Sequence, residues 1–255
     1  MLPYDEAGEG SAMVLLHAGI ADRSMWSEQL EPLAEAGYRV VAPDLPGFGD
    51  APIAAGEQAP WSDVLGLMDE LEIERAVLVG NSFGGAVALR VAVLAGERVT
   101  ALVLVSAPAP GLDPSAQLQA AWKAEEAGLD RGDLESAVSA VVNAWTLPDA
   151  PTELRERVAT MQRRAFARQA AAGEVSEAPD PVEADPDLLG GLDMPALVTA
   201  GELDMPDFRR SLRSLASVLP QARSALIAGA AHLAPLERPS EFRALLLSFL
   251  REVAT

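Results

Sequence analysis

The stretch Gly80-Asn81-Ser82-Phe83-Gly84 decides the fold class of this 255-residue chain. It follows the apolar run 76–79 (Ala-Val-Leu-Val) and precedes residues 85–89 (Gly-Ala-Val-Ala-Leu), which are typical of the start of a helix. A serine between two glycines at a strand-to-helix turn matches G-x-S-x-G, the nucleophile-elbow pattern. Such a turn strains the serine backbone and exposes its hydroxyl, so the pattern predicts a reactive Ser82. A glycine-rich turn with a serine on it is the alternative interpretation.

Short β-branched apolar runs recur on both sides of this turn and predict buried strands. The expected strands are residues 13–16, 39–42, 76–79, 100–105, 196–199 and 223–227. Helical patterns are expected at residues 26–36, 61–71 and 85–95 and in a final helix that starts at Pro239. Strands that alternate with helices predict an α/β fold with a mostly parallel, doubly wound sheet covered on both faces.

The alternation stops between residues 111 and 190, where three helices are expected without a strand between them, at 118–128, 134–145 and 153–172. We therefore expect a helical cap at residues 111–190 over a core formed by residues 1–110 and 191–255. Such a cap covers the carboxyl edge of the sheet, where ligands bind in open α/β folds. Trp122 and Trp145 of the cap are candidate lining residues, although packing is the favoured interpretation of aromatic residues at helical spacing.

The charge balance argues against two classes of partner. Thirty-eight acidic and nineteen basic residues give a net charge of −19, which repels nucleic acids and anionic membranes.

No apolar stretch approaches the roughly 20 residues needed to span a bilayer. Residues 1–6 carry acids where a secretory signal carries Lys or Arg. We expect a cytoplasmic protein without nucleic-acid or membrane partners, and its oligomeric state stays open.

The scarcity of cysteine and histidine limits the available chemistry. The chain has no cysteine, which excludes disulfides, thiolate nucleophiles and Cys-type zinc sites. His17 and His232 are its only imidazoles, too few for a histidine-rich metal site. We therefore expect neither a metal nor another cofactor.

A serine hydroxyl needs a neighbouring base, and His232 is the better candidate for that base. It follows the last expected strand and precedes the final helix, at the same sheet edge as Ser82. The imidazole in turn needs a carboxylate that fixes its tautomer. Asp204 follows the strand at 196–199 and completes the chain order Ser, Asp, His that the elbow predicts. Asp207 and Glu202, in the same loop, are rival candidates.

Acyl transfer also requires donors that stabilise an oxyanion, usually two backbone N–H groups. The N–H of Phe83, directly after the nucleophile, is one candidate. The other is expected in the loop after the strand at 13–16, where Gly19 is the first choice and Ile20 the second. His17 is then a structural residue that holds this loop through hydrogen bonds.

Five ordered segments together resemble the α/β-hydrolase superfamily, in its esterase and lactonase branch. They are Leu15-Leu16-His17-Ala18-Gly19, Pro43-Asp44-Leu45-Pro46-Gly47-Phe48-Gly49, residues 80–85, residues 201–204 and residues 232–239. The resemblance implies a helical cap inserted after the sixth strand and an acyl-enzyme mechanism. It assigns Ser82 as nucleophile, His232 as base and Asp204 as acid. Ala18 stands where the family usually has glycine, so a reshaped oxyanion loop is expected.

Within this superfamily, the nucleophile and the residue after the histidine argue against some classes of reaction. Epoxide hydrolases and haloalkane dehalogenases use aspartate at the elbow, whereas this chain has Ser82. Carbon–carbon bond hydrolases usually place tryptophan after the histidine, whereas this chain has Leu233. We therefore expect a hydrolase of a small carboxylic ester or lactone, with Ile20, Trp122, Trp145 and Leu233 near the substrate. The alternatives are a signalling or ligand-binding homologue with little turnover, and a specialised biosynthetic or C–C bond hydrolase.

Overall fold

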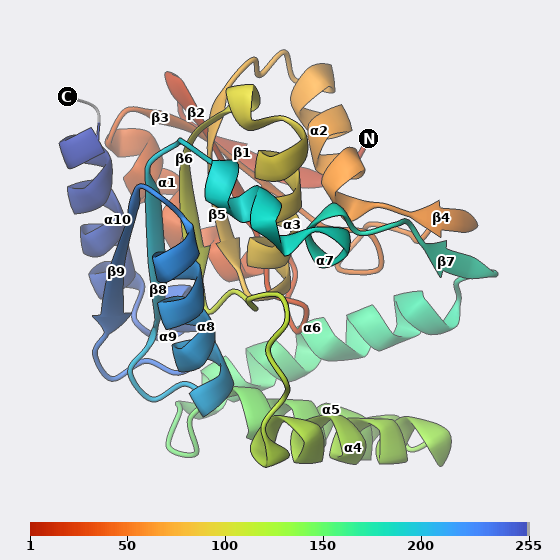
Figure 1. Ribbon diagram of the computed structural model, residues 1–255. Helices are drawn as coiled ribbons and strands as arrows, with labels where there is room; N and C mark the ends of the chain where they lie inside the picture. The colour runs from red at the N-terminus through yellow and green to blue at the C-terminus, as the bar shows by residue number, and fades with distance from the viewer. Residues whose placement is uncertain (254–255) are drawn as a thin grey trace.

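A seven-stranded sheet forms the centre of the molecule in the computed structural model, which describes residues 1–253 (Figure 1). The strand order is β1-β3-β2-β5-β6-β8-β9, and β1 is antiparallel to β3 while the other neighbours are parallel. The strands are β1 (Tyr4–Ala7), β2 (Ser11–Leu16), β3 (Tyr38–Pro43), β5 (Ala76–Asn81), β6 (Val99–Val105), β8 (Ala196–Gly201) and β9 (Ala222–Ile227). All six expected strands lie within these bounds, and the expected mostly parallel α/β sheet is confirmed.

Three short strands were not predicted. β1 pairs with β3 at the edge of the sheet, and its polar sequence Tyr-Asp-Glu-Ala lacks the apolar character of the central strands. β4 (Gly56–Gln58) and β7 (Val175–Glu177) form a separate two-stranded parallel ladder. These two strands are three residues long and largely exposed, so neither presents a hydrophobic pattern.

Alternating side chains of the sheet build two hydrophobic clusters on its opposite faces. In β2, Met13 and Leu15 enter one cluster, whereas Val14 and Leu16 enter the other. This division follows from the period of two along a strand. Helices α1 (Ser27–Glu35) and α10 (Pro239–Val253) cover the first face, and α2 (Pro60–Glu70), α3 (Phe83–Leu94) and α8 (Pro206–Val218) cover the second.

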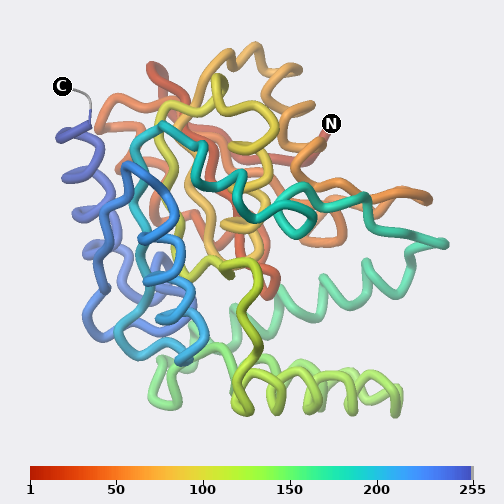
Figure 2. The backbone as a smooth tube through the Cα atoms, in the orientation of Figure 1, coloured from red at the N-terminus to blue at the C-terminus, as the bar shows by residue number. Residues whose placement is uncertain are grey.

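Three consecutive helices lie beyond the carboxyl ends of the central strands (Figures 1 and 2). They are α4 (Ala116–Asp130), α5 (Leu134–Trp145) and α6 (Thr152–Ala170). The chain then returns through β7 and α7 (Pro181–Ala184) to β8. Val182 and Leu189 pack in the core cluster with α3 side chains, so the end of the 111–190 segment contacts the core. The division into core and cap at residues 110 and 190 stays a prediction.

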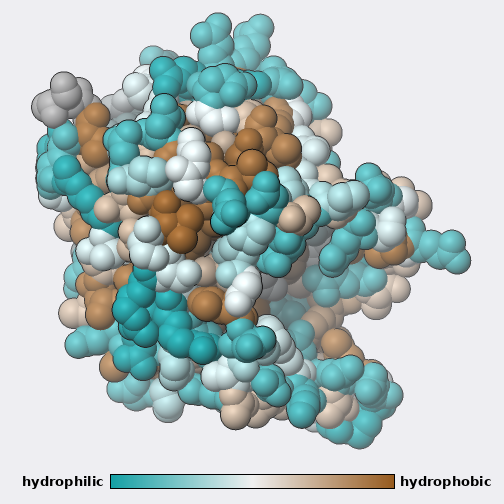
Figure 3. Space-filling model, viewed as in Figure 1, coloured by the Kyte–Doolittle hydropathy of each residue, from teal (hydrophilic) through white to brown (hydrophobic). Residues whose placement is uncertain are grey.

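The surface is largely hydrophilic on the face shown in Figure 3, where the β4–β7 ladder projects from the body of the molecule. Within residues 1–253, no helix combines the length and apolar character required to cross a membrane.

Candidate active site

Ser82 occupies a strained turn between β5 and α3. Its backbone has φ 53° and ψ −114°, a conformation that side-chain-bearing residues rarely adopt. A Cβ atom on Gly80 would lie 2.3 Å from the carbonyl oxygen of Gly84, and one on Gly84 would lie 2.2 Å from that of Leu16. Both flanking positions therefore require glycine, as the elbow pattern predicts.

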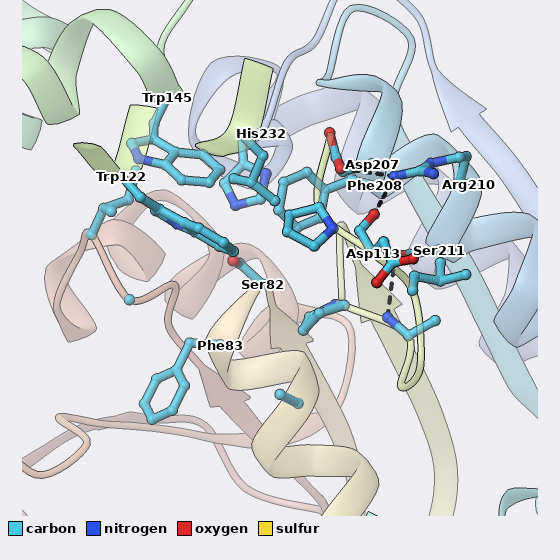
Figure 4. A pocket seen from close by; sticks show the side chains of 18 of the residues that line it. Ser82, Phe83, Asp113, Trp122, Trp145, Asp207, Phe208, Arg210, Ser211 and His232 are labelled. Atoms are coloured by element: carbon cyan, nitrogen blue, oxygen red, sulfur yellow. Dashed lines mark hydrogen bonds and ion pairs between the residues drawn. The ribbon is translucent and has the colours of Figure 1, made fainter. Parts of the chain in front are cut away.

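The elbow opens into a cavity of about 530 Å³ that residues of α4 and α5 also line (Figure 4). Ser82 and His232 both line this cavity, although they are 150 positions apart in the sequence. Within residues 1–253, the Ser82 hydroxyl forms no hydrogen bond. The expected pairing of this hydroxyl with the His232 imidazole stays a prediction.

His232 is held by a buried carboxylate and by two aromatic rings. Its Nδ1 lies 3.2 Å from each carboxylate oxygen of Asp204. The amide of Met205 also donates to Asp204 Oδ1, at 2.7 Å. The ring centroids of Trp145 and Phe208 lie 4.5 and 4.2 Å from that of the imidazole. These contacts leave the imidazole little freedom to rotate.

The two rival carboxylates of the loop have other partners. Asp207 accepts hydrogen bonds from the amide and hydroxyl of Ser115, at 2.7 and 2.6 Å, and pairs with Arg210. Burial raises the pKa of Asp207, but the hydrogen bonds from Ser115, the Asp207 backbone amide and Arg210 together outweigh it and hold the pKa below its usual value. Glu202 is exposed and accepts from the amide of Gly229. Among the three candidates, Asp204 is the one that contacts His232.

Two backbone amides beside Ser82 have no hydrogen-bond partner among the described residues, as expected for oxyanion donors. Phe83 and Gly19 line the cavity beside Ser82, and within the described chain neither amide donates a hydrogen bond. The two loops are tied together, because the amide of Gly84 donates to the carbonyl of His17 at 3.0 Å. The N–H of Ile20, the second choice, is also unbonded within the described residues.

The buried side chain of His17 holds the loop that contains Gly19 through two hydrogen bonds. Its Nε2 accepts from the amide of Leu45 at 2.9 Å, so Nδ1 carries the proton and donates to the carbonyl of Ala18 at 2.8 Å. The side chain is fully buried, and burial lowers its pKa below the usual value. These contacts agree with the structural role expected for His17.

The candidate substrate residues do not all reach the cavity. Ile20, Trp122 and Trp145 line it, and Trp122 is half exposed at its mouth. Leu233 does not: it is fully buried and packs in the hydrophobic core with α1 and α10. The prediction for Leu233 was wrong because adjacent residues in an irregular loop point in different directions, and only His232 faces the cavity.

Two residues at the site were missed by the sequence analysis. Phe208 packs against His232 with its ring tilted, and its signal was the buried helical stripe that it shares with Leu212 and Leu215. Asn81 is buried directly before the nucleophile, and its amide donates to the carbonyls of Val105 and His232, both at 3.1 Å. The sequence offers no signal that this asparagine reaches the histidine loop.

The cavity has an acidic lining. Asp113, Glu125 and Asp207 contribute three carboxyl groups, against the single guanidinium of Arg210. Burial raises the pKa of Glu125. Within residues 1–253, no three acidic or histidine side chains are grouped so that they could hold a metal ion.

The sequence profile of the family described as "alpha/beta hydrolase fold" matches residues 11–239, so the chain belongs to this family. A 112-residue segment is 41% identical to a 2-hydroxy-6-oxo-6-phenylhexa-2,4-dienoate hydrolase of Comamonas testosteroni and covers 41% of this chain and 39% of that protein. The match to this curated relative thus spans about two fifths of its length.

Solved structures match over nearly the whole chain. A thermophilic esterase from Thermogutta terrifontis superposes with a TM-score of 0.80 at 28% identity, over 100% of this chain and 94% of that one. The enol-lactonase of Burkholderia xenovorans LB400 gives a TM-score of 0.78 at 26% identity, over 98% and 96% of the two chains. The expected membership of the α/β hydrolases is confirmed.

Proposed function

We propose that this protein is a serine hydrolase that cleaves a small carboxylic ester or lactone through an acyl-enzyme intermediate. The observation that carries the proposal is the buried contact between His232 and Asp204, because His232 also lines the cavity that the strained Ser82 lines. An imidazole held by a carboxylate beside a serine at an elbow is the arrangement that activates a hydroxyl group.

In the acylation step, Ser82 Oγ attacks the substrate carbonyl carbon while His232 Nε2 takes the hydroxyl proton. The carbonyl oxygen becomes an oxyanion, which the amides of Phe83 and Gly19 stabilise by hydrogen bonds. Asp204 stabilises the imidazolium without taking its proton. The intermediate then collapses: the bond to the leaving oxygen breaks, and this oxygen receives the proton from His232.

Deacylation repeats the sequence with water. His232 removes a proton from a water molecule, and the resulting hydroxide attacks the acyl carbonyl on Ser82. The same two amides hold the oxyanion, and the proton on His232 returns to the Ser82 oxygen as the acyl bond breaks. The products are a carboxylic acid and the free enzyme. With a lactone, acid and alcohol are parts of one molecule.

The charges of the cavity favour a neutral substrate. Three carboxyl groups line it, and Arg210 is already paired with Asp207. An anionic substrate would meet repulsion that a neutral ester avoids. The apolar lining residues Ile20, Trp122 and Trp145 suit a hydrophobic alcohol or acyl group.

A carbon–carbon bond hydrolase is the second candidate, because the matching segment of the Comamonas testosteroni hydrolase is 41% identical. The substrate in that protein's name is a dienoate, which carries a carboxylate. The acidic lining argues against such a substrate here, and Leu233 replaces the tryptophan that this branch usually has after the histidine.

Covalent labelling and turnover test the proposal together. A fluorophosphonate probe should modify Ser82, as identified by peptide mass spectrometry, and p-nitrophenyl acetate should be hydrolysed over many turnovers. Ser82→Ala should abolish both signals while the circular dichroism spectrum is unchanged. Undiminished turnover in this variant would overturn the proposal. A single burst without further turnover favours a ligand-binding homologue, and activity confined to a dienoate favours the second candidate.

A further inference from the structure

A second cavity of about 540 Å³ lies next to the first and has no role in the steps described above. Its walls come from α2, α3 and the loop after β3, and the β4–β7 ladder contributes the remaining side. Its volume falls in the range of small-molecule sites, roughly 300–1,000 Å³. The lining is mainly apolar and includes Pro46, Ile53, Trp61, Val87, Val175 and Ala178.

The two cavities share a wall. Phe83 and Ala86, on the first turn of α3, line both of them. The Phe83 ring points away from Trp122 and Trp145, toward the far side of the elbow (Figure 4). Its centroid lies 5.8 Å from that of Phe48. Ala86 contributes only a methyl group to this shared wall, so the Phe83 ring is the one large side chain that lines both cavities.

Two of the three charged residues in the second cavity, Arg90 and Asp180, are paired with each other. The guanidinium of Arg90 donates from Nε and from the terminal nitrogen to the Asp180 carboxylate, at 2.9 and 2.6 Å. The Arg90 side chain is only 9% exposed, so its charge is committed to this pair. The exposed carboxylate of Glu177 is the other charge in the lining. An anionic ligand would find no free cation there, whereas an uncharged hydrocarbon chain fits the apolar walls.

The chemistry of the first cavity decides which part of a substrate enters the second. The leaving oxygen takes its proton from His232, so the alcohol group must lie on the histidine side of Ser82. His232 lines the first cavity and not the second. The acyl group, on the opposite side of the carbonyl carbon, is therefore directed toward Phe83 and Ala86.

We propose that the second cavity is an acyl subsite that takes an uncharged aliphatic chain longer than acetyl, while the first cavity takes the alcohol. This inference rests on the proposed serine hydrolase function and extends it to a class of substrate, the esters of medium-chain fatty acids. The β4–β7 ladder joins segments more than 115 positions apart and closes one side of this subsite.

Filling the cavity tests the subsite. Ala178 is half-buried in its lining, and its backbone donates to the carbonyl of Gln58, a bond that a substitution preserves. In Ala178→Phe, the ratio of kcat/KM for p-nitrophenyl octanoate to that for the acetate should fall at least about tenfold, the lower end of what one misfitting methylene costs. Ala184→Phe is the matched control, because Ala184 is exposed nearby on α7 and outside the lining; its ratio should equal that of the wild type.

Enlarging the cavity should have the opposite effect. Trp61→Ala removes an indole from the lining and should raise the ratio of decanoate to octanoate turnover. Thermal denaturation of each variant shows whether it is folded, and either variant alone suffices for the test. Ratios that stay at the wild-type value in whichever of Ala178→Phe and Trp61→Ala is folded would overturn the subsite.

A binding measurement distinguishes a failure of the acyl subsite from a failure of the proposed catalytic function. In the Ser82→Ala background, the Kd of p-nitrophenyl octanoate is measured by tryptophan fluorescence, with and without Ala178→Phe. Weaker octanoate binding in the double variant supports the subsite even if the wild type turns over no ester, in which case the catalytic proposal fails. Hydrolysis with unchanged octanoate binding and unchanged chain-length ratios overturns the subsite and leaves the catalytic proposal standing.

Discussion

His232 Nδ1 lies 3.2 Å from both carboxylate oxygens of Asp204, and the two side chains are 3% and 1% exposed. A carboxylate in this position accepts the Nδ1 proton, so it favours the tautomer in which Nε2 is free to accept another proton. Because both groups are shielded from water, their interaction is weakly screened. The geometry therefore selects the imidazole state that the proposed mechanism needs.

Asp204→Asn should lower kcat for p-nitrophenyl acetate about 10³–10⁴-fold, because an amide at this position favours the wrong imidazole tautomer. KM should change little, since Asp204 does not line the cavity. Steady-state kinetics check the expectation.

Glu202→Gln is the matched control for this variant. Glu202 is in the same loop, but it is exposed and bonds the amide of Gly229 instead of His232. Its kcat should stay near the wild-type value. Equal losses in the two variants would show that the loop, and not the Asp204 carboxylate, matters for turnover.

The parts of the fold that follow simple periodicities could be predicted from the sequence. The central strands are continuous apolar runs because both of their faces are buried, and the helices that cover them have one apolar stripe. β1, β4 and β7 lack such patterns, because an edge strand or an exposed ladder buries little side-chain surface. A strand whose pairing depends on tertiary contacts need not have a recognisable hydropathy pattern in its sequence.

The residues of the candidate site also differ in how far the sequence alone predicts them. Ser82 and His232 could be predicted because a turn motif and the scarcity of histidine mark them. Asp204 could not be separated from Asp207 by the sequence, because the choice depends on side-chain direction in an irregular loop. Asp207 instead bonds Ser115, a residue 92 positions earlier. Such a long-range contact cannot be read from local spacing.

Gly84→Ala should destabilise the protein by about 1–3 kcal/mol or more, because the new methyl group would meet the backbone of Leu16, which cannot move aside easily. Gly66→Ala should instead increase the free energy of unfolding. Gly66 is exposed inside α2 with open space around its Cα, so alanine should stabilise the helix by about 0.5–1 kcal/mol. Urea denaturation measures both. A tolerated alanine at position 84 would contradict the close approach of the elbow to β2.

Asp207→Ala should loosen the first turn of α4. Asp207 on α8 accepts from the amide and hydroxyl of Ser115, and the Ser115 hydroxyl in turn accepts from the amide of Leu118. Loss of the carboxylate leaves the Ser115 donors without their partner, at a cost of about 1–3 kcal/mol. Hydrogen–deuterium exchange should accelerate in the first turn of α4. Asp207→Asn keeps one acceptor oxygen and should show a smaller increase; equal exchange in Asp207→Ala and the wild type would refute the anchoring role.

His17 should make the stability of the protein depend on pH just below neutrality. Burial lowers the pKa of His17 below the 6.5 of a free imidazole and outweighs the opposing effects of the Ala18 hydrogen bond and of the Asp44 and Asp22 carboxylates. Above that value His17 is neutral in both the folded and unfolded states, and its contribution to stability is fully present. As the pH falls, the unfolded chain takes up a proton that the folded protein resists, so the free energy of unfolding should decrease.

His17→Gln should flatten this slope between about pH 7.5 and 5.5, because glutamine does not titrate in that range. Its side-chain oxygen can still accept from the amide of Leu45, the contact that His17 Nε2 makes. The variant is expected to be less stable than the wild type at pH 7.5, and the difference should shrink on acidification. Urea denaturation at several pH values measures the slope for both proteins. Parallel slopes would show that His17 titrates alike in the folded and unfolded states, contrary to its burial.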